Sequence, residues 1–504
     1  MIGFTRRTIL ITAATAAMFV ALSCARAAAE TVFTCFINHT WYPVSSFTGV
    51  IPEEITRLTG VRLDVTIAKD QRQLNMMLAS NALPDLIFTG SQFDALSDPA
   101  VCLDYDTLIE RAGLDWAIAE DLRSNALIFS GDGKLYTIIN YYTRTQDWAD
   151  TRSVPMTASL MARQDILDDM GNPPLNTTDD LMDVYLRVRR EYPDIIPLMF
   201  ESTHRFNAFR TYFGLGLTEF TRQPDGRYLF FARDPRYKEM LAWLNRLYRE
   251  GCIPPENFAA SPRQENVPYK QGRVFSYSAC TQNVNLSLDN ALKQIDPSYH
   301  SVELPPLQGA NYAMSSLGWS GTFIPLNNHD PEVAITFIQW MFTPQAQRLT
   351  QWGREGIDYT LNDEQLPVYS AALMASLQDD SYIQTYNPWF HFGSSAVLES
   401  EGRCALLPFN DYADAYDQIR QAYINKPWII AAAPKTGDPE KRAYDRILAA
   451  VNDQETYILV SESVEAFEAR WEAYQDSLLQ MDVEGLELHI NEAIPELRAR
   501  YAAP

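Results

Sequence analysis

The chain lacks the cysteine spacing of a zinc site or of a redox-active dithiol. It has six cysteines in 504 residues, and none of them form a Cys-x-x-Cys pair. Its six histidines are scattered, and it has no Gly-x-Ser-x-Gly elbow, His-Glu-x-x-His motif or P-loop. The sequence signals of metalloenzymes, serine hydrolases and nucleotide-binding proteins are therefore missing. We expect no catalytic residues, no metal and no cofactor.

Positive charge is also scarce, with 41 lysines and arginines against 64 acidic residues and a net charge of −23. A surface this acidic repels nucleic acid and anionic lipid at long range. We therefore expect no nucleic-acid partner, although a local group of arginines could still hold one anionic ligand.

Long apolar stretches are limited to residues 9–22, which follow Arg6 and Arg7 and precede small residues suited to signal peptidase. This run is too short for a comfortable transmembrane span, so residues 1–29 are predicted to be a signal segment. The paired arginines are compatible with both the general secretory route and the twin-arginine route. Removing the segment takes away three arginines and no acid, which changes the net charge to −26.

Two processing routes compete at the end of this segment. Small residues at positions 25–29 fit signal peptidase, whereas residues 22–24 loosely match a lipobox whose Cys24 would carry lipid. A strand-like run follows almost at once, without the flexible spacer usual after a lipidated cysteine. We therefore prefer a periplasmic mature protein that starts near Ala28 or Glu30. The alternative is a cell-membrane lipoprotein anchored at Cys24.

The length implies more than one hydrophobic core, because single cores stop growing near about 250–300 residues. No repeat or low-complexity tract divides the chain, which favours two lobes that share it. Residues 31–37, 61–68 and 83–88 are predicted strands separated by helices. Such a series folds as parallel strands, and ligands lie off their carboxyl ends. This rule points to the loops 39–42 and 89–92.

The rest of the chain alternates further strands and helices. A strand at 161–163 leads into a helix at 164–170, Thr177 or Thr178 caps another helix, and Asp330 caps a third ahead of a first-turn proline. Near the C-terminus, an apolar stripe is predicted to pack against a lobe and not to bind a cofactor. Its members are Val464, Phe467, Trp471, Tyr474 and Leu478.

Two segments carry a resemblance to a known family. Residues 161–171 (Met-Ala-Arg-Gln-Asp-Ile-Leu-Asp-Asp-Met-Gly) and 352–359 (Trp-Gly-Arg-Glu-Gly-Ile-Asp-Tyr) resemble the family 1 solute-binding proteins of ABC importers. The segments 83–85, 133–136 and 328–337 and the terminal helix pair occur in the order seen in that family, so the resemblance covers nearly the full mature chain. In length and layout the chain is similar to the alginate-oligosaccharide receptors.

The resemblance implies an α/β, two-lobed periplasmic-binding-protein fold of type II, a Venus flytrap with discontinuous lobes and extra C-terminal helices. The implied lobes are residues 30–150 with 310–370, and residues 151–309 with 371–504. It also implies a receptor, not an enzyme, that captures an oligosaccharide in the interlobe cleft by hinge closure and delivers it to the membrane subunits of an ABC importer. We expect a monomer, because the cleft must close and both lobes must then dock on the importer.

One departure from the family concerns calcium. The alginate receptors carry a calcium-binding loop after the helix that resembles residues 180–192. Here Tyr192-Pro193-Asp194 leads directly into a strand, which leaves no room for the oxygen ligands of a calcium ion. We predict no calcium at this position, and alginate becomes a less favoured ligand.

A pyranose ring has a polar rim of hydroxyl groups and an apolar face, so its receptors combine aromatic side chains with planar hydrogen-bonding groups. Candidate ligand-binding residues are expected in loops and near the points where the chain passes from one lobe to the other. They are His39, Trp41, Ser91, Tyr141, Tyr142, Arg144, Tyr277, Trp319, Trp389 and Phe390. For Tyr141, Tyr142 and Tyr277, a position in the core is an equal alternative. Arginines of the same region could clamp a uronic acid or sulfated sugar, with a surface or lobe-stabilising role as the alternative; these are Arg144, Arg152, Arg163, Arg205 and Arg210.

Two other functions stay open from the residues alone. The same fold accepts many ligands through changes in its loops, so the solute could be a peptide or another non-sugar compound. A secreted glycoside hydrolase or lyase would also be acidic and rich in aromatic residues, and its two carboxylates could lie among the 64 acidic residues.

Overall fold

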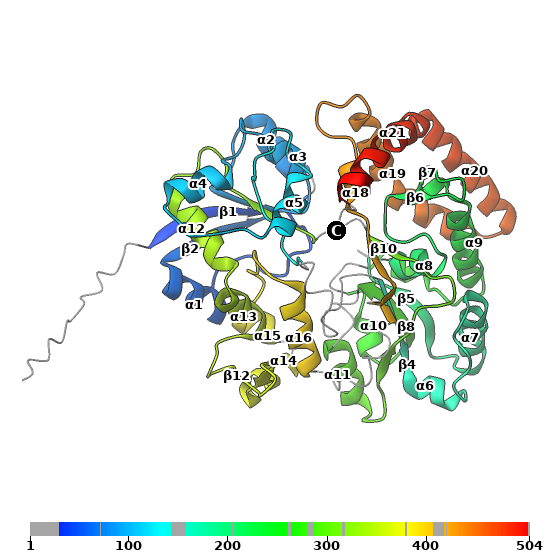
Figure 1. The fold of residues 1–504 in the computed structure, drawn as a ribbon. Helices are drawn as coiled ribbons and strands as arrows, with labels where there is room; N and C mark the ends of the chain where they lie inside the picture. The colour runs from blue at the N-terminus through cyan, green and yellow to red at the C-terminus, as the bar shows by residue number, and fades with distance from the viewer. Residues whose placement is uncertain are drawn as a thin grey trace, which may run out of the picture.

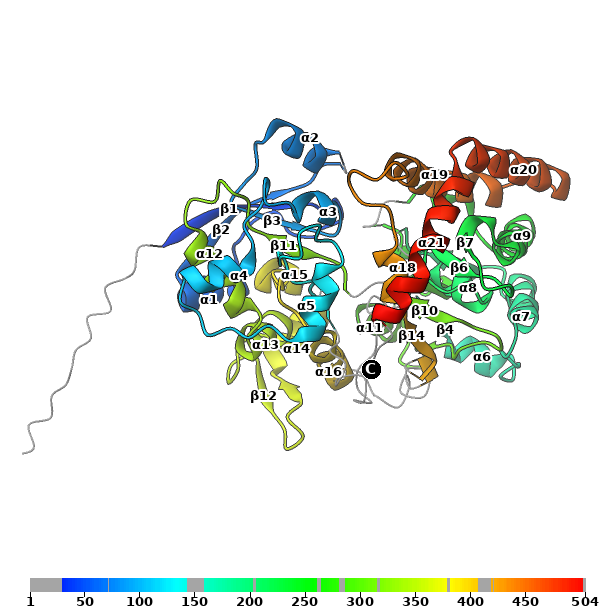
Figure 2. The same cartoon turned by 45° about the horizontal axis from the view of Figure 1, so that its top comes forward.

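Two lobes, each with its own sheet and hydrophobic core, make up the computed structural model of the chain (Figure 1). A view turned by 45° shows the same separation (Figure 2). The predicted two-lobed α/β architecture is therefore confirmed. The structure describes residues 30–70, 72–142, 158–202, 205–260, 264–280, 286–314, 318–378, 381–406, 418–419 and 421–501.

The sheet of the first lobe has the strand order β11-β3-β1-β2. As predicted, β1 (Thr31–Ile37) pairs in parallel with β2 (Val61–Ile67) and β3 (Leu86–Thr89), and β11 (Gly321–Phe323) adds an antiparallel edge. All four residues of β3 are buried, as expected of an interior strand covered on both faces. Gly60 ends the first helix in the left-handed conformation. The helices of this stretch are α1 (Val50–Thr59), α2 (Gln73–Ser80), α3 (Phe93–Leu96), α4 (Tyr105–Arg111) and α5 (Glu120–Leu127).

A second stretch of chain completes this lobe. Asp330 caps its first helix by accepting a hydrogen bond from the Val333 amide at 3.3 Å, as the sequence predicts. In the family segment 352–359, the Asp358 carboxylate accepts hydrogen bonds from the Arg354 amide at 2.7 Å and from the Tyr386 hydroxyl at 3.1 Å. The second bond connects the loop to α15 (Ser381–Tyr386). The elements after β11 are α12 (Pro331–Met341), α13 (Pro344–Trp352), β12 (Tyr359–Leu361), β13 (Pro367–Tyr369), α14 (Ala371–Gln378), α15 (Ser381–Tyr386) and α16 (Ala396–Leu406).

The main sheet of the second lobe has the order β5-β8-β4-β9, with β5 and β8 parallel and the other pairs antiparallel. Thr177 and Asp180 form a capping box at the start of α7. The strands are β4 (Ala158–Arg163), β5 (Ile196–Phe200), β6 (Phe220–Arg222), β7 (Tyr228–Phe230), β8 (Val274–Cys280), β9 (Ser301–Glu303), β10 (Tyr312–Met314) and β14 (Tyr423–Asn425). The helices before β14 are α6 (Gln164–Asp169), α7 (Thr178–Glu191), α8 (Asn207–Tyr212), η2 (Phe231–Arg233), α9 (Pro235–Arg249), η3 (Pro255–Phe258), α10 (Val267–Lys270) and α11 (Leu286–Ile295).

The C-terminal helices pack on the second lobe beside α9 (Figure 1). They are α18 (Pro427–Ala431), α19 (Lys441–Leu459), α20 (Val464–Gln480) and α21 (Val483–Tyr501). The predicted apolar stripe on α20 is buried against this lobe from Phe467 to Leu478, which confirms its packing role. Val464 is the exception, 51% exposed at the first position of the helix.

The two cores indicate where the chain changes lobe. Four buried side chains from the segment after residue 370 belong to the core of the first lobe; they are Leu373, Tyr386, Phe390 and Phe392. These side chains share one core with residues of β1 and β3, which argues against the expectation that residues 371–504 all belong to the second lobe. We propose a first lobe of residues 30–142 with 318–406, and a second lobe of residues 158–314 with 418–501.

A polar contact joins the two lobes away from their cores. The carboxylate of Asp94, in α3, accepts hydrogen bonds from the backbone amide and the hydroxyl of Thr436 at 2.8 and 2.6 Å. Thr436 lies in the loop between α18 and α19, which reaches toward the first lobe in Figure 2. Within the described part of the chain, no helix combines the length and the apolar character needed to cross a bilayer.

Candidate functional site

Aromatic rings gather where four segments of the first lobe meet. We define the aromatic cluster as His39, Trp41, Tyr141, Trp319, Trp389 and His391. Neighbouring ring centroids lie 5.1–6.2 Å apart in tilted or edge-to-face geometry. Trp41 is 37% exposed, and Tyr141, Trp319 and Trp389 are partly exposed. The cluster therefore leaves apolar faces open to a ligand.

The sheet topology explains why these segments meet. The carboxyl ends of the parallel strands β1 and β3 lie side by side, and β11 begins beside the end of β3 because it runs antiparallel to it. His39, which follows β1, thus reaches Ser320, with 2.6 Å between His39 Nε2 and Ser320 Oγ. Gly90 permits this approach, because a Cβ atom there would lie 2.5 Å from the carbonyl oxygen of Trp319.

Asn140 holds three segments of the cluster in register. Its buried side chain donates to the carbonyl oxygen of His391 at 3.3 Å and accepts from the amide of Ser320 at 3.0 Å. The next residue, Tyr141, has a φ of 56° and donates its amide hydrogen to the carbonyl oxygen of Ser394 at 2.6 Å. Sequence reasoning missed Asn140, because its partners are all distant in sequence. The sequence marked the polar loop 389–391 as a candidate, but of its residues only Trp389 and Phe390, and not His391, were predicted to bind the ligand.

Of the predicted ligand-binding residues, the structure brings into the cluster His39, Trp41, Tyr141, Trp319 and Trp389. Ser91 lies beside it, exposed, and its hydroxyl accepts from Asn38 Nδ2 at 3.1 Å. Phe390 and Tyr142 instead point into the core of the first lobe. Phe390 is fully buried with its ring centroid 4.6 Å from that of Phe47, and the Tyr142 hydroxyl accepts from Gln347 at 2.9 Å.

Tyr277 and Arg144 do not join the cluster in the described structure. Tyr277 is only 3% exposed in a core of the second lobe, with its ring centroid 5.6 Å from that of Tyr269. The alternative of a core tyrosine therefore describes Tyr277 better. Arg144 and Arg152 lie outside the described residues.

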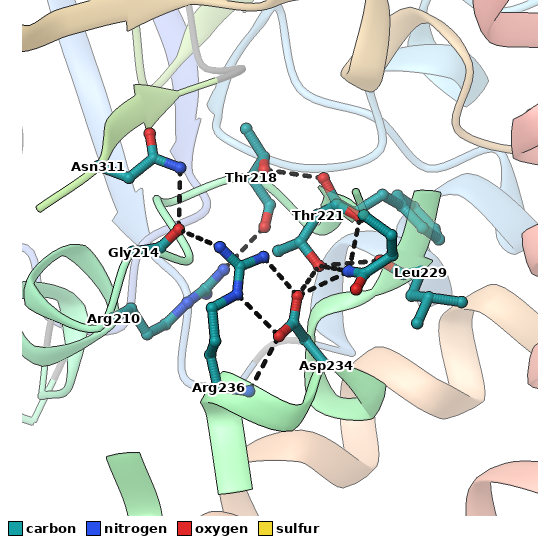
Figure 3. Close-up of polar contacts among 10 residues, drawn as sticks. Arg210, Gly214, Thr218, Thr221, Leu229, Asp234, Arg236 and Asn311 are labelled. Atoms are coloured by element: carbon teal, nitrogen blue, oxygen red, sulfur yellow. Dashed lines mark hydrogen bonds and ion pairs between the residues drawn. The ribbon is translucent and has the colours of Figure 1, made fainter. Parts of the chain in front are cut away.

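The other three candidate clamp arginines make contacts within the second lobe. Arg163 is buried and pairs with Asp165. Arg205 donates to the Thr456 hydroxyl at 2.5 Å. Arg210 donates to the carbonyl oxygen of Thr218 at 2.7 Å, as Figure 3 shows, and lies 3.9 Å over the Phe231 ring. These contacts fit the lobe-stabilising alternative and leave the three guanidinium groups engaged with protein groups.

Both histidines of the aromatic cluster are uncharged at neutral pH. Burial lowers the pKa of His39 to about 4. Burial also lowers the pKa of His391 to about 4, against a smaller opposing effect of the hydrogen bond to Pro388. His391 Nδ1 lies 3.2 Å from the Pro388 carbonyl oxygen, which can only accept, so Nδ1 carries the proton and Nε2 keeps its lone pair. The cluster therefore offers aromatic faces and neutral polar groups.

Acidification is expected to destabilise the protein through His39. The unfolded chain binds a proton at this residue near pH 6.5 and the folded chain only near pH 4. The free energy of unfolding should fall by up to about 3 kcal/mol as the pH decreases from 6.5 to 4, with no effect of His39 above that window. Urea denaturation of wild type and His39→Gln across this range measures the difference. The control is His300→Gln, on a partly exposed loop before β9. Identical pH dependence in wild type and His39→Gln would contradict the expectation.

On the second lobe, acidic side chains lie near the carboxyl end of β5. Glu201 directly follows that strand and is 5% exposed. Glu265 accepts a hydrogen bond from the amide of Ser202 at 2.7 Å. Its pKa is raised, first by burial and further by the nearby Glu201, despite the Ser202 hydrogen bond. This end of the second sheet therefore carries two carboxylates, with the Arg205 guanidinium near enough to Glu265 to oppose the rise of its pKa. Across the described residues, no group of three or more His, Cys, Asp or Glu side chains is placed to hold a metal ion.

Solved structures share this architecture. The alginate-binding protein AlgQ2, solved without calcium ion, superposes with a TM-score of 0.72 at 15% identity, covering 92% of this chain and 98% of that one. FusA of S. pneumoniae in complex with kestose gives 0.66 at 19% identity, covering 93% and 100%. NgtS of Streptococcus pneumoniae in complex with Man5GlcNAc gives 0.58 at 12% identity, covering 93% and 99%. At these identities the likeness shows the fold.

The family assignment comes from the sequence. No curated protein matches the chain. The family model described as bacterial extracellular solute-binding protein matches residues 53–354, which is more than half of the chain. The chain therefore belongs to the bacterial extracellular solute-binding proteins, the non-enzymatic receptors that serve ABC transporters.

Proposed function

We propose that the protein captures an oligosaccharide between its lobes in the periplasm and delivers it to the membrane subunits of an ABC importer. The aromatic cluster carries this proposal, because partly exposed rings beside neutral polar groups match the apolar face and hydroxyl rim of a pyranose. FusA and NgtS, which are similar in fold, have been solved with kestose and Man5GlcNAc. Burial of a short oligosaccharide with a few stacking contacts gives about −8 to −10 kcal/mol, a micromolar or tighter receptor.

The contact between Asp94 and Thr436 supports capture by lobe closure. It joins α3 of the first lobe to the loop before α19 of the second, so the lobes already touch at one point in this conformation. Closure about the crossings would bring the second lobe over the aromatic cluster and exclude water from a bound ring.

To test this proposal, the melting temperature of the protein is measured in the presence of a panel of uncharged trisaccharides and, for comparison, of peptides of similar size. Maltotriose, cellotriose, mannotriose and kestose represent the sugars. A ligand that binds only the folded protein raises its Tm, by an amount that grows with ligand concentration. A Tm increase with one or more sugars, and recovery of that sugar unaltered on thin-layer analysis, supports the proposal. A shift with peptides alone would replace it with the non-sugar alternative.

Mass spectrometry of the mature protein, expressed with its signal segment, distinguishes the two processing routes. A start near Ala28 or Glu30 indicates the free periplasmic form. A lipid-modified Cys24 at the new N-terminus would instead indicate the anchored lipoprotein.

Trp41→Ala is expected to weaken binding of the best panel sugar about 10-fold or more, since exposed aromatic anchors dominate such interfaces. Trp41 is 37% exposed, so its removal should change the Tm of the free protein little. Titration calorimetry measures the affinity. The matched control is Tyr457→Ala, which removes an aromatic side chain that is 52% exposed on α19 of the other lobe. Equal affinities for wild type and Trp41→Ala would place the sugar elsewhere.

A further inference from the structure

The charge of the ligand can be argued from the polar groups around the aromatic cluster. Among the described residues of the first lobe, polar groups near its rings include the Ser320 hydroxyl, at 2.6 Å from His39 Nε2, and the Asn38 amide with the Ser91 hydroxyl at the end of β3. All of them are uncharged. They suit the hydroxyl groups of a sugar and supply no countercharge for an acid.

The second observation concerns His391. Its imidazole is 8% exposed, and its Nε2 atom is buried with no hydrogen-bond partner in the part of the chain that the structure describes. The ring lies among Tyr141, Trp319 and Trp389, at centroid distances of 5.5, 6.2 and 5.4 Å. Because Nδ1 donates to the Pro388 carbonyl oxygen, Nε2 keeps a lone pair on a ring that contacts the cluster. A lone pair attracts a hydroxyl donor and repels a carboxylate.

The third observation is the position of the nearest candidate countercharges. The described arginines expected to clamp an acid are engaged within the second lobe, with Arg163 on Asp165, Arg205 on Thr456 and Arg210 on Thr218. The end of β5 carries Glu201 and, beside Ser202, Glu265. Among the described residues, no arginine or lysine is found in contact with the rings of the aromatic cluster, so a carboxylate or sulfate bound there would lose hydration without an ion pair from these residues, which is costly.

From these three observations we propose that the site selects uncharged sugars and rejects uronic acids and sulfated sugars. The inference rests on the proposed function and specifies its substrate class. The aromatic faces bind the ring, neutral donors and acceptors bind its hydroxyl groups, and the lone pair of His391 and the carboxylates Glu201 and Glu265 of the second lobe disfavour anions.

The experiment compares sugars that differ only in oxidation at C6. Mannotriose is paired with trimannuronate, and the best sugar of the panel is paired with the product of oxidising its primary hydroxyl groups to carboxylates. Affinities are measured by titration calorimetry at about 20 mM and about 500 mM salt. We expect the neutral member to bind at least about 10-fold more tightly at low salt, with a smaller ratio at high salt because exposed charges are screened.

A variant tests whether the aromatic cluster sets this preference. Ser91→Lys places a cation at an exposed position beside the cluster and should narrow the neutral-to-acid ratio about 5-fold. Thr360→Lys is the matched control, because Thr360 is an exposed hydroxyl residue on the β12–β13 hairpin, which lies away from the second lobe in both views. It should leave the ratio unchanged.

The outcomes separate this inference from the proposed function. If the wild-type protein binds the uronate as tightly as the neutral sugar or more tightly, the selection for uncharged sugars is wrong. The proposed function as a sugar receptor would still hold. If Ser91→Lys and Thr360→Lys change the neutral-to-acid affinity ratio equally, the aromatic cluster does not set the preference for uncharged sugars. Binding of neither member of any pair overturns the inference together with the proposed function.

Discussion

Gly318→Ala is expected to destabilise the first lobe by about 3 kcal/mol or more and to abolish ligand binding. Gly318 has a φ of +144°, and a Cβ atom there would lie 2.0 Å from the carbonyl oxygen of Asn140 and 2.7 Å from the Ile139 side chain. The clash involves backbone that is held by hydrogen bonds between Asn140 and Ser320, so it cannot be relieved by rotating a side chain. The loop must shift, and Trp319 must shift with it.

Urea denaturation and sugar titration measure both effects. The matched control is Gly113→Ala, since Gly113 has a φ of +63° in the same lobe but no atom within 4 Å of the position that an alanine methyl group would take. It should cost only the left-handed backbone strain, about 1–2 kcal/mol, and leave binding intact. Equal destabilisation by the two variants would show that close approach at Gly318 has no special role.

Asp234→Ala is expected to destabilise the second lobe by about 3 kcal/mol or more. The fully buried carboxylate accepts hydrogen bonds from the Arg236 guanidinium at 2.9 and 2.6 Å, from the Thr221 hydroxyl at 2.7 Å and from Gln223 at 2.7 Å (Figure 3). It also caps α9 by accepting from the Arg236 amide at 3.0 Å. Its removal leaves several donors without an acceptor.

The same carboxylate predicts acid sensitivity. Burial raises the pKa of Asp234, but the hydrogen bonds from Arg236, Gln223 and Thr221 outweigh it and lower the pKa to about 2. Because the folded-state pKa lies below the ordinary value of 3.8, this stabilisation is present above pH 3.8 and is lost as the pH falls through about 2. On acidification through that window, the free energy of unfolding of Asp234→Ala should therefore fall less than that of the wild-type protein.

The control for both measurements is Asp225→Ala. Asp225 pairs with Arg227 at 2.7 Å in the exposed turn between β6 and β7, where an ion pair contributes little. Its removal should leave the free energy of unfolding almost unchanged, because water screens this exposed pair. Similar destabilisation by Asp225→Ala and Asp234→Ala would contradict the argument from burial.

Local sequence signals predicted much of the fold. The first strand was predicted at residues 31–37 and is β1, Thr31–Ile37. The caps at Thr177 and Asp330 lie where the sequence places them. These features depend on side chains a few residues apart, which is why a sequence without any alignment reveals them. For the residues after 370 we propose a lobe boundary that the sequence did not predict, because no local signal tells which of two cores a helix will cover.

The candidate site was only partly predictable. His39 and Trp41 follow from the rule that ligands lie at the carboxyl ends of parallel strands. Phe390 and His391 show the limit of that reasoning. Phe390 lies in the core and His391 lies beside Trp389 in the aromatic cluster, and adjacent loop residues have no periodicity that would predict this difference. Asn140 was invisible for the same reason, as it joins segments 180 and 251 residues away.

The amino-acid sequence by itself determined the α/β class, the helix caps and the family, and it predicts the export segment. Tertiary structure alone decided that His39, Trp319 and His391 share one aromatic cluster, that Phe390 and Tyr142 are core residues, and that Arg163, Arg205 and Arg210 make contacts within the second lobe. The physical reason is that secondary structure arises from neighbours along the chain, whereas a binding site arises from loops that the sheet order brings together over hundreds of residues.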